Sequence, residues 1–304
     1  MEKKAFAAEN VDLFISSCKN EEELIETVKD AHIIIFTFSK ITANVINRLT
    51  NCKMVIRYGV GLDNVDIKAA TGKSIYVCNT PNYGTFAVAE HAFALLISVN
   101  RRIQLLDHNV RNNIWDIQSI PPVYSLQHKT LGITGFGNIG RYVCKMALGF
   151  EMKVIVYDPY TDQETTGRLS AEKVSFDDLI KNSDHITLHA PLTEETRHIF
   201  SKDVFGKMKN TSTLINTSRG GLVNQNDLIM ALKSAQIAGA GMDVFENEPL
   251  DPHNELLTMK NVVLTPHVAW YTEDSIVNLH QEVIDEVIRV LNGNTPKNAV
   301  NKIR

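Results

Sequence analysis

Three glycines with the spacing GxGxxG, Gly135, Gly137 and Gly140, are the first residues whose pattern points to chemistry. They follow the strand-like LGIT and open a helix-like segment that includes Asn138 and Ile139. The first glycine permits a tight turn, the second lets the backbone approach a pyrophosphate, and the third allows helix and strand to pack closely. Free N–H groups and the helix dipole then favour phosphate at the helix N-terminus. Because glycine turns often serve packing alone, the motif by itself is weak evidence.

A second strand-like run, VIVYD, ends in Asp158, close to the spacing of about 20 residues at which a ribose-binding carboxylate is expected. The glycines and this carboxylate together favour a dinucleotide site over a structural turn. An anion at this position would repel a 2′-phosphate, and the following Pro159 and Tyr160 bring no cation to accept one. The pattern therefore predicts NAD rather than NADP.

Arg219, Glu248 and His267 each follow or precede a strand-like run, in INTSRGG, DVFENEP and LTPHVAW. Ligands bind at the carboxyl ends of strands in open α/β sheets, so these positions can converge. Histidine suits acid and base catalysis near neutral pH, and a neighbouring carboxylate fixes its tautomer. Arginine matches a substrate carboxylate in fork geometry. Taken singly, the three could equally be a surface ion pair, a solvated loop acid and a loop histidine with its hydrogen bonds satisfied.

Composition narrows the class of protein. The 304 residues favour two domains, and a formal net charge of −4 without a Lys or Arg run makes a nucleic-acid surface unexpected. No apolar segment approaches the about 20 residues needed to span a bilayer, and the charged N-terminus does not resemble a signal peptide, which predicts a cytoplasmic protein without a membrane partner. The four cysteines are scattered and predict buried structural thiols rather than a metal or redox site.

Short β-branched runs alternate with helix-length segments and predict βαβ units around parallel sheets. Expected strands before the motif lie at 11–16, 32–38, 53–58 and 74–79, and a long helix spans 85 to about 106. The rhythm restarts at Leu131 and continues at 154–158, 185–190, 213–218, 237–244 and 262–266. Two α/β domains in series are therefore expected, and the amphipathic segment 273–291 could belong to either.

Seven ordered segments resemble the D-isomer-specific 2-hydroxyacid dehydrogenase family, and the likeness runs from about Val11 to Leu291. They are 57–70, 77–97, 135–141, 188–198, 215–221, 243–249 and 265–272. The resemblance implies two doubly wound parallel-sheet domains: a flavodoxin-like substrate domain, 1–97 plus 271–304, and an inserted Rossmann NAD-binding domain, 98–270. The active site is expected in the cleft between them.

The same resemblance implies roles for individual residues. Arg219, Glu248 and His267 match the family's catalytic arginine, glutamate and histidine. For a 2-keto acid substrate, Arg219 would bind the carboxylate while the Glu248-supported His267 exchanges a proton with the substrate oxygen. The N–H groups of Val60 and Gly61 would bind the other carboxylate oxygen.

Two residues of the expected substrate site have two interpretations each. Arg57 would reach the substrate carboxylate or form an ion pair at the domain rim. Trp270 would shape the pocket or pack at a domain edge. For the cofactor, Asp243 would orient the nicotinamide amide. The residues expected to line NAD are His189, Pro191 and Thr217.

Family members are commonly homodimers, and the segment 101–115 resembles their dimer arm. Only about ten residues precede the segment VDLFISS, so the substrate domain is expected to lack its first strand. The substrate is expected to be a small 2-hydroxy or 2-keto acid of the glycerate, hydroxypyruvate or 3-phosphoglycerate type. The alternative is an NAD(H)-sensing protein similar to the family's corepressors, which retain both sites.

Overall fold

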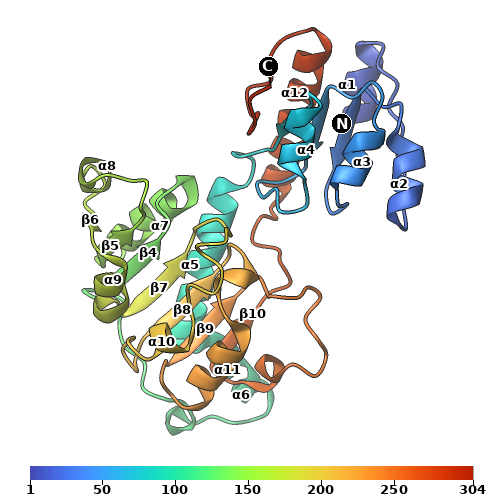
Figure 1. Ribbon diagram of the computed structural model, residues 1–304. Coiled ribbons are helices and arrows are strands. Elements are labelled where there is room, and N and C mark those ends of the chain that lie inside the picture. The colour runs from blue at the N-terminus through green and yellow to red at the C-terminus, as the bar shows by residue number, and fades with distance from the viewer. Residues whose placement is uncertain (304) are drawn as a thin grey trace. The chain divides into compact units, whose positions relative to one another are not determined.

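The computed structural model describes residues 1–303 and separates into two compact units (Figure 1). The first comprises Met1–Gly84 with Tyr271–Arg304, and the second is Thr85–Trp270. The sequence placed the first change of domain between residues 97 and 98. In the structure the second unit already starts with helix α5 (Thr85–Arg101).

The first unit is built on a three-stranded parallel sheet in the order β1-β2-β3. Its strands are β1 (Ile33–Phe36), β2 (Met54–Arg57) and β3 (Tyr76–Cys78). Helices α2 (Glu21–Val28), α3 (Ala43–Arg48) and α4 (Ile67–Gly72) supply the core on one face. Helices α1 (Glu2–Ala8) and α12 (Glu273–Leu291) supply the core on the other. Apolar side chains on both faces explain why these strands read as continuous β-branched runs.

The expected strand at 11–16 is wrong. This segment has no regular secondary structure, and its apolar residues Phe14 and Ile15 are 79% and 68% exposed. A β-branched run becomes a strand only when a neighbouring strand pairs with it and its side chains find a core. The amphipathic segment 273–291 is confirmed as α12, and it belongs to the first unit.

The second unit holds a seven-stranded, wholly parallel sheet in the order β10-β9-β8-β7-β4-β5-β6. The strands are β4 (Thr130–Thr134), β5 (Lys153–Tyr157), β6 (Glu172–Lys173), β7 (His185–Leu188), β8 (Thr213–Asn216), β9 (Gly239–Met242) and β10 (Val262–Leu264). The strand order reverses beside β4, where doubly wound sheets bind their ligands. The predicted α/β fold with two parallel sheets is confirmed.

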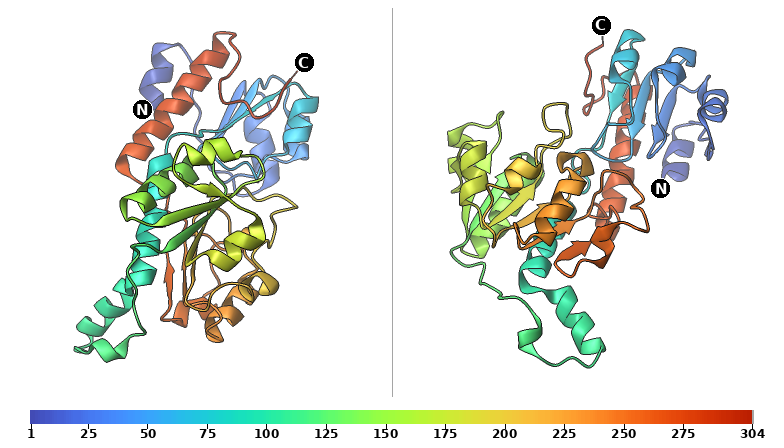
Figure 2. Two further views of the ribbon diagram at one scale, coloured as in Figure 1. Left: turned by 90° about the vertical axis from the view of Figure 1, so that its left-hand side faces the viewer. Right: turned by 60° about the horizontal axis from the view of Figure 1, so that its bottom comes forward.

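Helices cover both faces of this sheet (Figure 2). Helices α5 and α7 (Asn138–Gly149) pack on one face. Helices α9 (Phe176–Asn182), α10 (Lys202–Phe205) and α11 (Gln225–Lys233) pack on the other. The shorter elements are α8 (Gln163–Gly167), η1 (Ile117–Ser119), η2 (Gly220–Leu222) and η3 (Glu255–Thr258).

The single long helix expected from 85 to about 106 is two helices. α5 ends at Arg101, and α6 (Ile103–Arg111) begins after Arg102, whose φ of 56° lies in the left-handed region. A residue with this φ cannot continue a right-handed helix. α6 and the loop after it extend away from the sheet (Figure 2) and expose Ile103, Val110 and Trp115.

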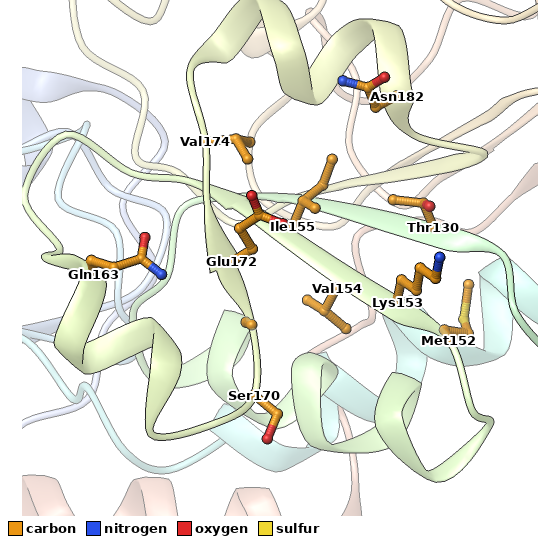
Figure 3. A pocket seen from close by; sticks show the side chains of 11 residues that line it. Thr130, Met152, Lys153, Val154, Ile155, Gln163, Ser170, Glu172, Val174 and Asn182 are labelled. Carbon is orange, nitrogen blue, oxygen red and sulfur yellow. The ribbon is translucent and has the colours of Figure 1, made fainter.

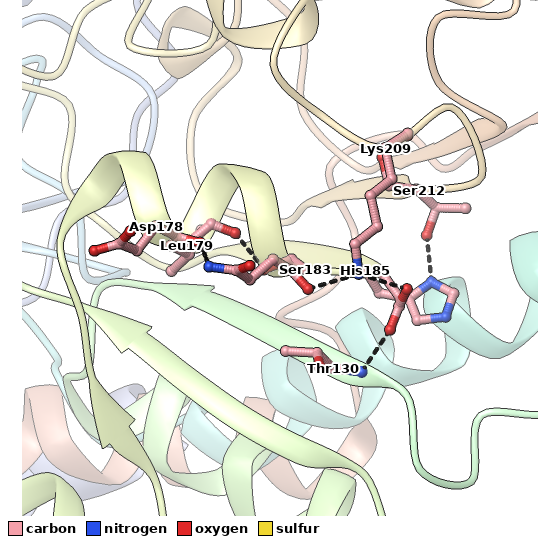
Figure 4. Close-up of polar contacts among 10 residues, drawn as sticks. Thr130, Asp178, Leu179, Ser183, His185, Lys209 and Ser212 are labelled. Atoms are coloured by element: carbon pink, nitrogen blue, oxygen red, sulfur yellow. Dashed lines mark hydrogen bonds and ion pairs between the residues drawn. The ribbon is translucent and has the colours of Figure 1, made fainter.

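A polar cluster secures the amino ends of the central strands (Figure 4). Asp184 accepts hydrogen bonds from the backbone N–H of Thr130 at 2.8 Å and from Lys209 Nζ at 2.9 Å. The neighbouring His185 ring is bonded through Nδ1 to Thr213 Oγ1 at 2.8 Å, and its burial lowers its pKa to about 4. These contacts connect the starts of β4, β7 and β8 and lie at the edge of the sheet opposite to the predicted site residues.

Candidate active site

The predicted residues of the second unit gather at one edge because all seven strands are parallel. They follow the carboxyl ends of six strands: Gly135 after β4, Asp158 after β5, His189 after β7, Thr217 and Arg219 after β8, Asp243 after β9, and His267 after β10. The sheet topology therefore brings together side chains that are far apart in the sequence.

The glycine turn has the geometry that the sequence predicted for it. At Gly135, with φ of 91°, a Cβ atom would lie 2.6 Å from the backbone of His189 and Ala190. At Gly140 a Cβ would lie 2.3 Å from the Gly135 carbonyl oxygen, so helix α7 can approach β4 only without a side chain there. Gly137 is the N-cap of α7, and a Cβ there would meet no atom within 4 Å. The first and third glycines thus serve close packing, while the second leaves the N-terminus of α7 open to an anion.

Asp158 closes this turn from the end of β5. Its Oδ2 accepts a hydrogen bond from Phe136 N at 2.7 Å, and its Oδ1 accepts one from Tyr160 N at 2.8 Å. Each carboxylate oxygen can accept a further hydrogen bond. The side chain is therefore both fixed by the backbone and capable of accepting bonds from a diol such as a ribose.

Three buried polar atoms near the same edge have no hydrogen-bond partner within residues 1–303. They are Thr134 Oγ1, His189 Nδ1 and Thr217 Oγ1. The His189 ring uses its other nitrogen, Nε2, in a 2.9 Å hydrogen bond with Thr187 Oγ1, and burial lowers its pKa to about 3. Buried polar groups are nearly always paired, so unpaired ones at a ligand edge are consistent with a bound polar molecule. The glycine turn, Asp158 and these atoms together fit a dinucleotide.

His267 and Glu248 form a direct pair. Glu248 Oε2 accepts a hydrogen bond from His267 Nδ1 at 2.6 Å, and Oε1 accepts one from Phe245 N at 2.9 Å. Partial burial raises the pKa of Glu248, but the two hydrogen bonds and the charges of His267 and Arg219 outweigh it and hold this pKa below its ordinary value. An ionised Glu248 fixes the hydrogen on Nδ1, which leaves Nε2 to face a substrate.

The loop that carries His267 is held by backbone contacts. His267 has a φ of 54°, uncommon for a residue with a side chain. Its N–H donates to the carbonyl oxygen of Asp243 at 2.8 Å, and its own carbonyl oxygen accepts from Trp270 Nε1 at 3.0 Å. The predicted alternatives for Trp270 were pocket lining and packing at a domain edge. In the structure its indole N–H holds the backbone of the histidine loop.

The Asp243 carboxylate is fully buried and supports the same loop. Oδ1 accepts from Thr265 Oγ1 at 2.6 Å and Val268 N at 2.9 Å, and Oδ2 accepts from Ala269 N at 2.9 Å. The expected contact of Asp243 with a nicotinamide amide stays a prediction.

Arg219 reaches the Glu248 region because the next residue lacks a side chain. At Gly220 a Cβ would lie 1.9 Å from the carbonyl carbon of Phe245, so the two loops touch through their backbones. Asn216, at the buried end of β8, shapes the turn: its Nδ2 donates to Arg219 O at 2.9 Å and its Oδ1 accepts from Ser218 N at 3.0 Å. Sequence reasoning missed Asn216, although an amide that ends an apolar strand was a signal for it.

In the first unit, the loop after β2 turns its carbonyl groups toward the protein. Arg57 donates to the carbonyl oxygens of Thr37, at 3.0 Å, and Gly61, and Asn79 Nδ2 donates to Val60 O at 2.7 Å. Within residues 1–303 the N–H groups of Val60 and Gly61 make no hydrogen bond. The loop therefore presents two backbone donors of the kind that bind a carboxylate.

A pocket beside β5 and β6 contains none of the predicted site residues (Figure 3). Its lining includes residues that start β4 and β5, Thr130 and Lys153, at the edge of the sheet away from the glycine turn. It takes no part in the site described above.

The model of the D-isomer specific 2-hydroxyacid dehydrogenase, NAD binding domain, matches residues 93–269. The chain belongs to this dehydrogenase family. It is therefore an NAD-dependent oxidoreductase of D-2-hydroxy acids, as the sequence predicted. A glyoxylate reductase of Thermococcus litoralis is 42% identical over 92% of this chain and 86% of its own length.

Two further similar proteins are named for substrates other than glyoxylate. A D-3-phosphoglycerate dehydrogenase of Archaeoglobus fulgidus is 37% identical over 96% of this chain, which spans only 55% of that relative. The structure of the D-lactate dehydrogenase from Aquifex aeolicus complexed with NAD and lactic acid superposes with a TM-score of 0.87 at 29% identity, covering 96% of this chain and 92% of that one. The family is thus shown, while the substrate side chain is not.

Residues 1–303 contain neither a membrane-spanning helix nor a metal-binding cluster. None of the helices there is long and apolar enough to cross a membrane. The same residues contain no group of three or more His, Cys, Asp or Glu side chains arranged to hold a metal ion. All four cysteines are free thiols; Cys78 and Cys144 are buried as predicted, whereas Cys18 and Cys52 are only half-buried.

Proposed function

We propose that this dehydrogenase reduces a small, unphosphorylated 2-keto acid of the glyoxylate or hydroxypyruvate type to the D-2-hydroxy acid. The observation that carries the catalytic proposal is the Glu248–His267 hydrogen bond of 2.6 Å. Bound NADH supplies the hydride to C2 of the substrate. His267 Nε2 gives a proton to the substrate oxygen, and the imidazole then keeps its Nδ1 hydrogen toward Glu248.

The remaining residues have binding roles in this proposal. Arg219 pairs with the substrate carboxylate and polarises the adjacent carbonyl group. The N–H groups of Val60 and Gly61 bind the second carboxylate oxygen. For the cofactor, we propose that the N-terminus of α7, which includes Gly137, Asn138 and Ile139, binds the pyrophosphate and that Asp158 binds the adenosine ribose. His189, Pro191, Thr217 and Asp243 complete the proposed cofactor site.

The preference for an unphosphorylated substrate rests on Arg57. A phosphorylated substrate needs a basic side chain to pair with its phosphate, and Arg57 is the basic residue at the start of the proposed substrate loop. Its guanidinium donates instead to the carbonyl oxygens of Thr37 and Gly61 and braces the loop. The similarity to a glyoxylate reductase over 86% of that relative supports the same choice.

The test is NADH oxidation by the purified protein with glyoxylate, hydroxypyruvate, pyruvate and phosphohydroxypyruvate, with His267→Gln as the control. We expect kcat/KM to be highest for glyoxylate or hydroxypyruvate and to be lost in the variant. A preference for phosphohydroxypyruvate would overturn the substrate proposal. Tight NADH binding without turnover of any substrate would favour the NAD(H)-sensing alternative.

A homodimer joined through the α6 segment is part of the same proposal. Ile103, Val110, Ile114 and Trp115 are all more than 40% exposed there. Exposed apolar side chains in one segment are typical of a protein interface. Light scattering checks it: Trp115→Glu should shift the protein toward the monomer. We also propose that the protein is cytoplasmic, as its sequence predicts.

A further inference from the structure

A second histidine contacts the residues that hold the loop of His267. His91, on helix α5, places Nε2 3.0 Å from Thr265 Oγ1 and 3.7 Å from Asp243 Oδ1. Thr265 and Asp243 follow β10 and β9 respectively, so this contact joins the helix to both strand ends. The proposed reaction uses none of these three side chains to move a proton.

The hydrogen-bond directions in this group are determined by proton count. The Thr265 hydroxyl has one hydrogen and donates it to the Asp243 carboxylate at 2.6 Å. Its oxygen can therefore only accept from His91, which means that His91 Nε2 carries a hydrogen. His91 is thus a donor that fixes the orientation of the Thr265 hydroxyl.

Close packing of α5 on β9 makes this reach possible. A Cβ at Gly241 would lie 3.0 Å from Leu95 Cβ, and one at Gly239 would lie 3.0 Å from Val99 Cγ1. His91, Leu95 and Val99 are spaced by four residues and share one helix face. The two glycines of β9 allow that face to lie against the strand, and His91 on the same face then meets the strand ends.

The hydrogen bonds of Thr265 and Asp243 hold the backbone of the His267 loop, in which His267 has a positive φ. The buried Asp243 carboxylate accepts from Val268 N and Ala269 N, the two residues after His267. Thr265 lies two residues before His267. A residue with a side chain rarely adopts a φ near +54°, and it keeps this conformation only where surrounding contacts hold it. The network therefore braces the loop on both sides of the catalytic histidine.

We infer that His91 is a positioning residue for the reaction, which acts through Thr265 and Asp243 to hold the His267 loop. This inference rests on the proposed role of His267. Its removal should lower kcat more than it changes KM for the keto acid, because the substrate-binding groups keep their places. Misplacement of a catalytic group by about 1 Å can cost about 100-fold in rate.

The experiment compares His91→Leu with His91→Gln, whose amide can restore a donor near the position of Nε2. We expect kcat to fall about 10- to 100-fold in His91→Leu and to recover largely in His91→Gln. His185→Leu is the matched control, since it removes another histidine–threonine hydrogen bond at the opposite edge of the sheet. It should lower Tm and leave kcat within about twofold of the parent enzyme.

Two kinetic results would overturn the inference. One is a His91→Leu enzyme with unchanged kcat, and the other is a loss of kcat that His91→Gln does not recover. Proton NMR of the His267 ring, assigned by its absence in His267→Gln, gives a readout that does not depend on turnover: we expect its signal to shift in His91→Leu and not in His185→Leu. An unshifted signal would also overturn the inference. Full turnover by His267→Gln would instead refute the proposed function, and the NMR comparison would still test the position of the loop.

Discussion

Glu248 binds His267 Nδ1 with one carboxylate oxygen and the backbone N–H of Phe245 with the other, at 2.6 and 2.9 Å. A backbone contact within its own loop therefore orients the carboxylate, and the carboxylate in turn orients the histidine ring. Since the loops of Phe245 and Gly220 touch through their backbones, the arginine beside Gly220 is positioned by the same contact. The proposed acid and the proposed carboxylate binder thus depend on one set of loop contacts.

Glu248→Gln should lower kcat for glyoxylate reduction about 100-fold or more, in the range of acid–base catalysis. The amide removes the negative charge that stabilises a protonated His267 ring and can present its NH₂ group to Nδ1. Glu246→Gln makes the same change two residues away, on the ion-pair partner of His198, and should keep most of the activity. Steady-state kinetics at saturating NADH measures both. Equal loss in the two variants would contradict a specific role for Glu248.

Asp158→Ser should reduce the preference for NADH over NADPH. Loss of the carboxylate removes the acceptor proposed for the ribose and the charge that repels a 2′-phosphate. We expect KM for NADH to rise about tenfold and KM for NADPH to fall, since one charged hydrogen bond contributes about 1.5–3 kcal/mol. Asp162→Asn, which changes the N-cap of α8, is the control and should alter neither KM. If the ratio of KM for NADH to KM for NADPH is unchanged in Asp158→Ser, cofactor selection depends on other residues.

Much of this architecture could be predicted from the sequence because the parallel strands are buried on both faces. The runs at 32–38, 53–58 and 74–79 correspond to β1, β2 and β3, and five later runs correspond to β5 and β7–β10. The failures have local causes. Segment 11–16 has strand-forming residues but no pairing strand, and the long helix breaks at Arg102, whose left-handed φ no periodicity could indicate.

The candidate site was predictable as a set of residue types but not as a set of contacts. Motif order predicted a site of Arg219, Glu248 and His267 without showing that Gly220 brings two loops into contact. The role of Trp270 was also hidden, because a donor to a backbone carbonyl leaves no pattern in the sequence. His91 lies in a helix that reads as apolar, and its contacts depend on strands more than 140 residues later in the chain.

Asp184→Asn should destabilise the second unit in a pH-dependent way. Burial raises the pKa of Asp184, but the Thr130 N–H bond and the Lys209 ion pair hold it below its ordinary value of 3.8. Because this pKa is lower in the folded state, the stabilisation is present above pH 3.8 and is lost as the pH falls through the folded value. We expect a Tm lower by about 2–4 °C at pH 7 and a smaller difference near pH 3. Calorimetry checks this, and a constant difference at both pH values would contradict it.

Gly220→Ala should impair both stability and catalysis, because its Cβ would overlap the backbone of Phe245 at 1.9 Å rather than a side chain that can rotate away. The loops must separate, which costs about 1–3 kcal/mol and displaces Arg219 from Glu248. Gly149→Ala is the matched control, since a Cβ at that position in α7 meets no atom within 4 Å. Calorimetry and steady-state kinetics on both variants should show lower Tm and a higher KM for the keto acid in Gly220→Ala alone. A Gly220→Ala enzyme with unchanged KM would show that Arg219 keeps its position without this loop contact.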